Sequence, residues 1–227
     1  MSVGTRLQAV GAHIYAKLQD FYAKLQDFAL RSTATAAIEF AMVLPVMLTA
    51  YIGSVEVGGG VTADRKLASL SLTLANLTAR YNLNQGIQDS DINGVFNASA
   101  AVLSPYDYTK AGMVITSFVF DSGVANPPNA YVVWSDATGP GAVAMTPSCT
   151  NAISTTIVPA NLRTQGGSVI LGQANFPYHP PIGYVVTGTV NLSEVNFMVP
   201  RYKPSIARTN SSTGKTYSTC VGSSLAP

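Results

Sequence analysis

Residues 36–57 read AAIEFAMVLPVMLTAYIGSVEV, and this stretch decides the architecture of the chain. About 22 mostly apolar residues, at a helical rise of about 1.5 Å each, cross a bilayer core of about 30 Å. Pro45 is tolerated in a membrane helix. Glu39 lies near the start, where a charge costs less than the roughly 2.5–3.5 kcal/mol that it costs at mid-membrane. We predict a membrane-spanning helix over residues 35–60, in which Glu39 pairs with a positive group.

The preceding segment repeats a heptapeptide, YAKLQDF, at residues 15–21 and 22–28. Apolar residues recur there at three- and four-residue intervals, which predicts an amphipathic helix within a leader of residues 1–34. Lysines on another face suit an anionic membrane surface, while a short coiled coil or a solvated leader are the alternatives. Basic residues outnumber acidic ones before the apolar stretch, so the positive-inside rule predicts a cytoplasmic amino terminus and an exported remainder.

Beyond the apolar stretch, the pattern predicts an exported α+β domain over residues 61–202 and a loose polar tail over residues 203–227. Gly58-Gly59-Gly60 is expected to end or loosen the membrane helix, and Thr62 or Asp64 to cap the next one. We predict helices packed on an antiparallel β-sheet. The predicted helices cover residues 62–81 and 90–103, and the predicted strands cover residues 113–120, 131–134, 168–174 and 187–197.

Composition narrows the class of protein. Of 227 residues, 47% are hydrophobic and only 11% are charged, which is charge-poor for a soluble cytoplasmic domain. The net charge of +2 and the lack of a basic patch argue against a nucleic-acid partner. Cys149 and Cys220 would form a disulfide in an oxidising compartment, and closing a loop of roughly 70 residues would stabilise the fold by about 4 kcal/mol. Two buried thiols are the alternative.

Catalytic and metal-binding patterns are absent from the sequence. The two histidines, His13 and His179, have no partner at metal-ligand spacing, and the later carboxylates are scattered. No phosphate loop or nucleophile elbow is present. We therefore expect no catalytic residue, no metal and no cofactor. Trp134 is expected in the core, and His179 at the end of a strand.

Residues 31–45, RSTATAAIEFAMVLP, resemble the amino-terminal signature of the TadE/TadG-like proteins of tight-adherence (Flp) pilus systems. In that family a basic residue and small residues precede an A-x-E-F-A-hydrophobic-L-P core. Weaker similarities follow in order along most of residues 31–202. They are GSVEVG at 53–58, ADRKL at 63–67, LSPY at 103–106, the strand around Trp134, residues 169–180 ending in FPYHP, and MVPR at 198–201.

The resemblance implies a function without catalysis. It implies a membrane-anchored pseudopilin or minor pilin that takes part in assembling a tight-adherence pilus, in the bacterial inner membrane, with its carboxyl-terminal domain periplasmic or extracellular. Glu39 and Phe40 would form the assembly contact in the membrane helix. Partners would be pilins or other pilus assembly proteins in an oligomeric assembly, and a prepilin peptidase cutting between Ala34 and Thr35. Glycine is usual before that cut, and Ala34 stands there in this sequence.

Other interpretations of the same residues stay open. Glu39 could lie at the cytoplasmic interface of an uncleaved anchor, or the whole start could be a secretory signal cut after Ala63. The exported domain could instead be an adhesin or binding module that never enters a pilus, or an envelope enzyme without a recognisable motif.

Overall fold

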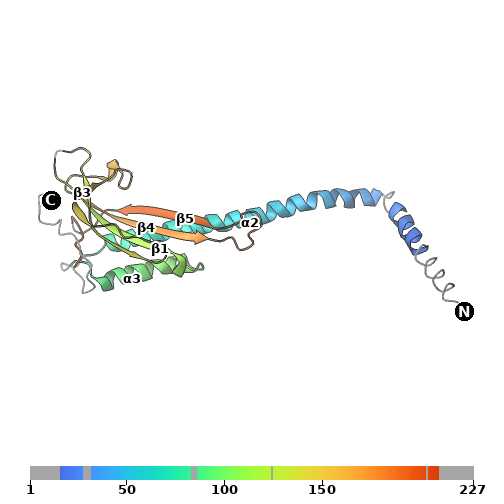
Figure 1. Cartoon of the computed structure of the whole chain (residues 1–227), viewed down its shortest axis with the longest axis horizontal. Helices are drawn as coiled ribbons and strands as arrows, with labels where there is room; N and C mark the ends of the chain where they lie inside the picture. Colours follow the sequence, from blue (N-terminus) through green and yellow to red (C-terminus); the bar gives the residue numbers. More distant parts are fainter. Residues whose placement is uncertain (1–15, 28–31, 83–85, 124, 203, 210–227) are drawn as a thin grey trace, which may run out of the picture. The chain divides into compact units, whose positions relative to one another are not determined.

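The computed structural model of the protein describes residues 16–27, 32–82, 86–123, 125–202 and 204–209. The chain divides into two compact units, residues 1–55 and residues 56–227. The second unit holds a five-stranded antiparallel sheet with helices, drawn in Figure 1. The predicted fold class is confirmed: a long apolar helix near the amino terminus is followed by an α+β domain.

The longest element, α2 (Ser32–Ala79), is one helix of 48 residues that runs through both Pro45 and the glycine triplet. The expectation that Gly58–Gly60 would end the helix is wrong, and its alternative, that the triplet loosens the helix, stays a prediction. Thr62, expected as a cap, instead donates its hydroxyl to the Gly58 carbonyl at 2.8 Å, as a residue inside a helix does. Each glycine costs a helix about 1 kcal/mol relative to alanine, so tertiary contacts must hold this turn.

The predicted helix over residues 90–103 and the four predicted strands are present, and one further strand was missed. Three of the four strands are longer than expected, whereas the strand predicted over residues 187–197 is shorter and covers residues 190–198. The helical elements after α2 are α3 (Asp89–Ala100), η1 (Ala101–Leu103), η2 (Tyr108–Lys110) and η3 (Ala160–Leu162). The strands are β1 (Gly112–Phe120), β2 (Ala130–Thr138), β3 (Ser148–Ile153), β4 (Ser168–Tyr178) and β5 (Val190–Met198). Their order in the sheet is β3-β2-β1-β4-β5, with every neighbouring pair antiparallel.

The end of α2 packs on the sheet as the leucine spacing predicts. Leu67, Leu70 and Leu74 are fully buried in a core shared with α3 and with β1, β2 and β4. Trp134 is fully buried in the same core, as expected. At Gly172 in β4 the helix backbone comes so near that only a residue without a Cβ fits. The close packing of α2 on the sheet therefore depends on the missing side chain of Gly172.

A second, smaller core lies on the other side of the sheet. It is made by strand residues that include Phe118 and Val132, together with Val158 from the segment between β3 and β4. The alternation of side chains along a strand explains how β1 serves both cores. Every residue of β1 is buried, which identifies it as the central strand.

Within the leader, residues 16–27 are helical, as the heptad spacing predicts. Their side chains are exposed, Leu18 and Phe21 among them. Lys24 forms an ion pair with Asp20 at 2.8 Å, one turn earlier in the helix. The rest of the heptad repeat lies outside the described residues.

Candidate functional site

The apolar part of α2 leaves its large side chains uncovered. Phe40 is 62% exposed, Met42 75% and Val46 68%, and a stretch of α2 with a mean hydropathy of 1.7 has no buried residue. Large contiguous apolar surfaces on monomeric proteins mark membrane or protein contacts. By length and composition α2 is a candidate membrane span, the one such helix among the described residues. One apolar helix near the amino terminus fits single-pass anchoring.

Glu39 lies on this uncovered helix. It is exposed, and among the described residues it has no hydrogen-bond or ion-pair partner. Phe40, its neighbour, is exposed as well. The chain itself therefore supplies no described cation to Glu39, and pairing with a neighbouring chain stays a prediction.

The predicted processing site lies at the beginning of the same helix. Ala34 and Thr35 belong to the first turn of α2, which begins at Ser32. Thr35 and Glu39 are four residues apart, so they stand on neighbouring turns of one helix face. Cleavage between Ala34 and Thr35 stays a prediction.

A second carboxylate of the apolar stretch, Glu56, is buried, and the sequence interpretation passed over it. Only 1% of Glu56 is exposed, and its oxygens accept three backbone N–H groups. The donors are Tyr184 at 2.8 Å, Val185 at 3.0 Å and Val186 at 2.6 Å. Successive backbone N–H groups that converge on one anion form a nest. Here the anion belongs to α2 and the nest to the connection between β4 and β5.

Two tyrosines hold the glycine triplet beside Glu56. The Tyr106 hydroxyl donates to the Gly59 carbonyl at 3.2 Å, and its ring meets the Tyr178 ring edge to face at 6.1 Å. A Cβ on Gly59 would stand 2.5 Å from the Tyr178 hydroxyl oxygen. Burial, followed by the nearby Tyr106 and Glu56, raises the pKa of Tyr178 above its usual value. The triplet thus lets two aromatic side chains approach the helix closely.

We call Glu56, Gly59, Tyr106, Tyr178 and residues 184–186 the helix-root cluster. It joins α2 to the sheet through charge-assisted hydrogen bonds and close ring packing. Both oxygens of the Glu56 carboxylate accept hydrogen bonds from backbone donors. This geometry suits a structural role, in which Glu56 holds the connection between β4 and β5 against α2, rather than proton transfer. Sequence reasoning could have noticed Glu56 as a charge in an apolar stretch, but the loop that binds it is about 130 residues away.

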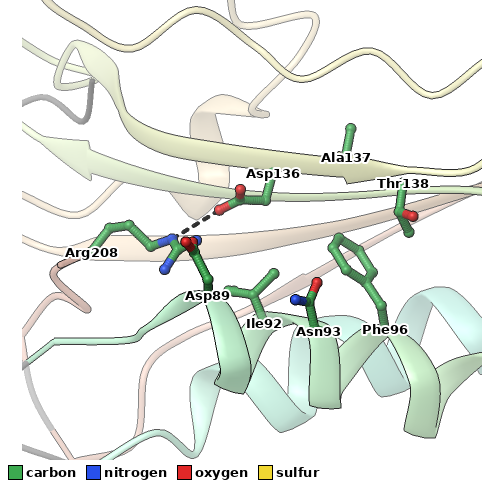
Figure 2. Close-up of a pocket in the computed structure, with 8 residues that line it drawn as sticks. All are labelled: Asp89, Ile92, Asn93, Phe96, Asp136, Ala137, Thr138 and Arg208. Atoms are coloured by element: carbon green, nitrogen blue, oxygen red, sulfur yellow. Dashed lines mark hydrogen bonds and ion pairs between the residues drawn. The ribbon is translucent and has the colours of Figure 1, made fainter. Parts of the chain in front are cut away.

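A second polar cluster of the domain is formed by Arg208, Asp136 and Asp89, as Figure 2 shows. Arg208, whose side chain is 1% exposed, donates to Asp136 at 3.0 Å and to the Ile87 carbonyl at 3.0 Å, and it also pairs with Asp89. Residues 86–88 and 207–209 run side by side through a parallel bridge. The cavity beside them, about 230 Å³, is small, and its charges already face one another.

The interpretation of the tail as loose is therefore wrong for residues 204–209. Ile206 is 2% exposed, and its carbonyl accepts the Trp134 indole N–H at 2.7 Å. A buried indole N–H needs an acceptor, and this segment provides it. The remainder of the predicted tail lies outside the described residues.

The cysteines and histidines add no described chemical site. Cys149 in β3 is half-buried and takes part in a disulfide, whereas Cys220 lies outside the described residues, so their mutual pairing stays a prediction. His179 follows β4 and is exposed, at hydrogen-bond distance from the Thr189 hydroxyl. Within the described part of the chain, no group of three or more His, Cys, Asp or Glu side chains could hold a metal ion.

Comparison with known proteins identifies one segment. Residues 34–73 match the model of a family described as TadE-like protein. The resemblance predicted from residues 31–45 is thereby confirmed, and the matched segment covers the apolar helix, Glu39, Glu56 and the glycine triplet. No curated protein and no solved structure matches the chain.

Proposed function

We propose that this chain, which carries a TadE-like segment, is a membrane-anchored pseudopilin or minor pilin that takes part in assembling a tight-adherence pilus without catalysing a reaction. The observation that carries the proposal is the coincidence of the TadE-like match, residues 34–73, with an apolar helix whose side chains are uncovered. Such a surface is costly in water and suits lipid or neighbouring helices. The inner membrane would hold the anchor, and the domain would be exported.

Glu39 would align the subunit with its neighbours. A carboxylate in hydrocarbon is strongly disfavoured unless a cation meets it, so subunits would settle where Glu39 finds one. If the chain is cut before Thr35, the new amine of a neighbouring subunit would supply that cation. Small residues around Glu39, such as Ala37 and Ala41, would let a neighbouring helix approach closely.

The domain would offer the binding surface for other pilus proteins. Its connection between β4 and β5 is bound to α2 at Glu56, and its sheet packs on α2 along Leu67, Leu70 and Leu74. A domain fixed in this way presents its strands and loops in one orientation relative to the part of α2 that begins at Glu56. This property suits a subunit of an ordered assembly.

The test is Glu39→Gln in cells that carry the pilus system. We expect the variant to reach the membrane with a folded domain and to lose piliation, because the amide keeps the shape but removes the charge. Asp64→Asn, the same change farther along α2, is the matched control and should leave piliation unchanged. Normal piliation with Glu39→Gln would refute the pairing mechanism.

Mass spectrometry of the mature amino terminus separates the processing alternatives. A start at Thr35 would establish prepilin cleavage, and a start at Met1 or Ser2 would establish an uncleaved anchor. A start at Asp64 would show a secretory signal and would refute the membrane-anchored proposal.

A further inference from the structure

The connection between β4 and β5 has an unusual surface for an exposed loop. Ile182 is 56% exposed, Tyr184 67% and Val185 45%, although all three lie on one short segment. No Asp, Glu, Lys or Arg occurs between residues 164 and 193. A loop in contact with water alone has no need of three uncovered apolar side chains and no charged residue of its own.

Three backbone N–H groups of this loop have hydrogen-bond partners within the protein. Tyr184, Val185 and Val186 donate their N–H groups to Glu56, so these donors need no water. Backbone groups that enter a lipid environment must be satisfied within the protein. The loop therefore combines apolar side chains that face outward with backbone donors that face inward.

Glu56 also fixes the position of the loop along α2. It is the last but one residue of the apolar stretch 36–57, and the first charges beyond it on the helix are Asp64, Arg65 and Lys66. Those charges begin eight residues later, about 12 Å along the helix. The loop consequently lies level with the point where the helix would leave the hydrocarbon core, in the layer that tyrosine side chains favour.

The helix faces the hairpin with both apolar and acidic side chains. A groove of about 410 Å³ lies between α2 and the hairpin of β4 and β5, with apolar side chains as most of its lining. Val57 and Val61 line it from the helix, beside the carboxylates of Glu56 and Asp64. Val186, Val190 and Leu192 line it from the hairpin. Val57 is 56% exposed and Val61 45% exposed. The groove thus begins at Val57, the last residue of the apolar stretch 36–57, and extends along the domain.

We propose that residues 181–186, together with Val57 and Val61, form a membrane-docking surface that inserts into the interfacial layer of the leaflet from which α2 emerges, with lipid acyl chains in the groove. This proposal rests on the membrane anchor of the proposed function. The hydrogen bonds of Glu56 to residues 184–186 keep the loop beside the helix and thus at the membrane. The occupant is lipid because the groove begins at Val57, the last residue of the apolar stretch, and because residues 181–186 carry no charge that would select a protein partner. Of the two carboxylates that line the groove, Glu56 is bound by backbone N–H groups, and Asp64 stands eight residues farther along the helix.

The test uses tryptophan as a depth probe in the full chain, reconstituted in vesicles of phosphatidylcholine and phosphatidylglycerol that contain lipids with a quencher on the acyl chain. Tyr184→Trp places the probe on the loop. Tyr202→Trp is the matched control, because Tyr202 is 63% exposed and adjoins Arg201, whose N–H bonds the Ala79 carbonyl at the end of α2. The native Trp134 is buried and gives the background to subtract.

We expect the quenching lipids to reduce emission from residue 184 and to leave emission from residue 202 unchanged. Ile182→Trp should repeat the loss, and it gives an independent measurement if one variant folds poorly. Vesicle flotation of the same samples reports the anchor separately. Flotation without quenching at 182 or 184 would overturn the docking surface alone, and would direct the search to a protein partner. Failure to float would overturn the anchor and the docking surface together.

Discussion

A Cβ added to Gly172 in β4 would lie 2.3 Å from the carbonyl oxygen of Ser71 in α2 and 2.9 Å from the amide nitrogen of Ala75. Both atoms belong to the backbone of a helix, which cannot turn aside as a side chain can. The nearby Asn196 amide in β5 donates to the Ser71 hydroxyl at 2.6 Å and ties the same turn to the sheet. Helix and sheet thus meet by backbone contact at this point.

Gly172→Ala should destabilise the protein by about 1–3 kcal/mol, because overpacking here must push α2 away from the sheet. Gly94→Ala is the control, since a Cβ at Gly94 in α3 meets nothing within 4 Å. There alanine should gain up to about 1 kcal/mol of helix propensity. Denaturant unfolding of the full chain in detergent, followed by Trp134 fluorescence, measures both. Equal stability of the two variants would contradict the close contact.

Glu56→Gln should release the connection between β4 and β5. A glutamine has one carbonyl oxygen where the carboxylate has two charged ones, and its NH₂ group would face backbone donors. We expect faster hydrogen exchange at the amides of Tyr184, Val185 and Val186, with β1 unaffected. Asp64→Asn serves as the matched change on the same helix. If exchange at these amides stayed at the wild-type rate, the carboxylate would not be what holds the loop.

Arg208→Met should destabilise the protein by about 3–5 kcal/mol, because a charged Asp136 with a side chain 2% exposed would lose its ion-pair partner. Adding Asp136→Leu should recover much of that loss, since two apolar side chains avoid the buried charge. Unfolding curves of the single and double variants give the coupling energy. Strictly additive losses would show that the two side chains do not act as a pair.

The predicted disulfide can be tested by alkylation under denaturing conditions. Neither cysteine should react before reduction and both should react afterwards, in a mass measurement of the intact chain. Replacing Cys149 and Cys220 together by serine should cost about 4 kcal/mol in the chain-entropy model, because the closed loop restricts the unfolded chain. A chain that reacts at both cysteines without reduction would contradict the pairing.

Local patterns predicted much of the fold. The apolar run, the leucine spacing and the β-branched strands identified α2, α3 and four strands. β3 was missed because Ser148–Ile153 alternates poorly, and its residues are at most half-buried at the edge of the sheet. The glycine triplet was misjudged because its helix is held by Tyr106 and Tyr178.

The functional residues show the same difference between local patterns, which the sequence reveals, and distant contacts, which it does not. Glu39 stands out because its surroundings in the sequence are apolar, and nothing distant is needed to notice it. The partners of Glu56 lie about 130 residues away, and those of Arg208 up to 121 residues away. Contacts between segments so far apart leave no periodic trace in the sequence, so neither cluster could be predicted from it.

The polar cluster around Arg208 can form only late in synthesis of the chain. Its hydrogen bond to Asp136 joins positions 72 residues apart, and its bond to the Ile87 carbonyl joins positions 121 residues apart. As the chain is synthesised, α2, α3 and the first strands emerge long before Arg208 does. The hydrogen bond from the Trp134 indole to the Ile206 carbonyl likewise cannot form until residue 206 has emerged. A subunit interrupted before these residues would carry its helix in full yet lack the bonds that close its sheet, so closure of the domain reports that the chain has emerged at least as far as residue 208.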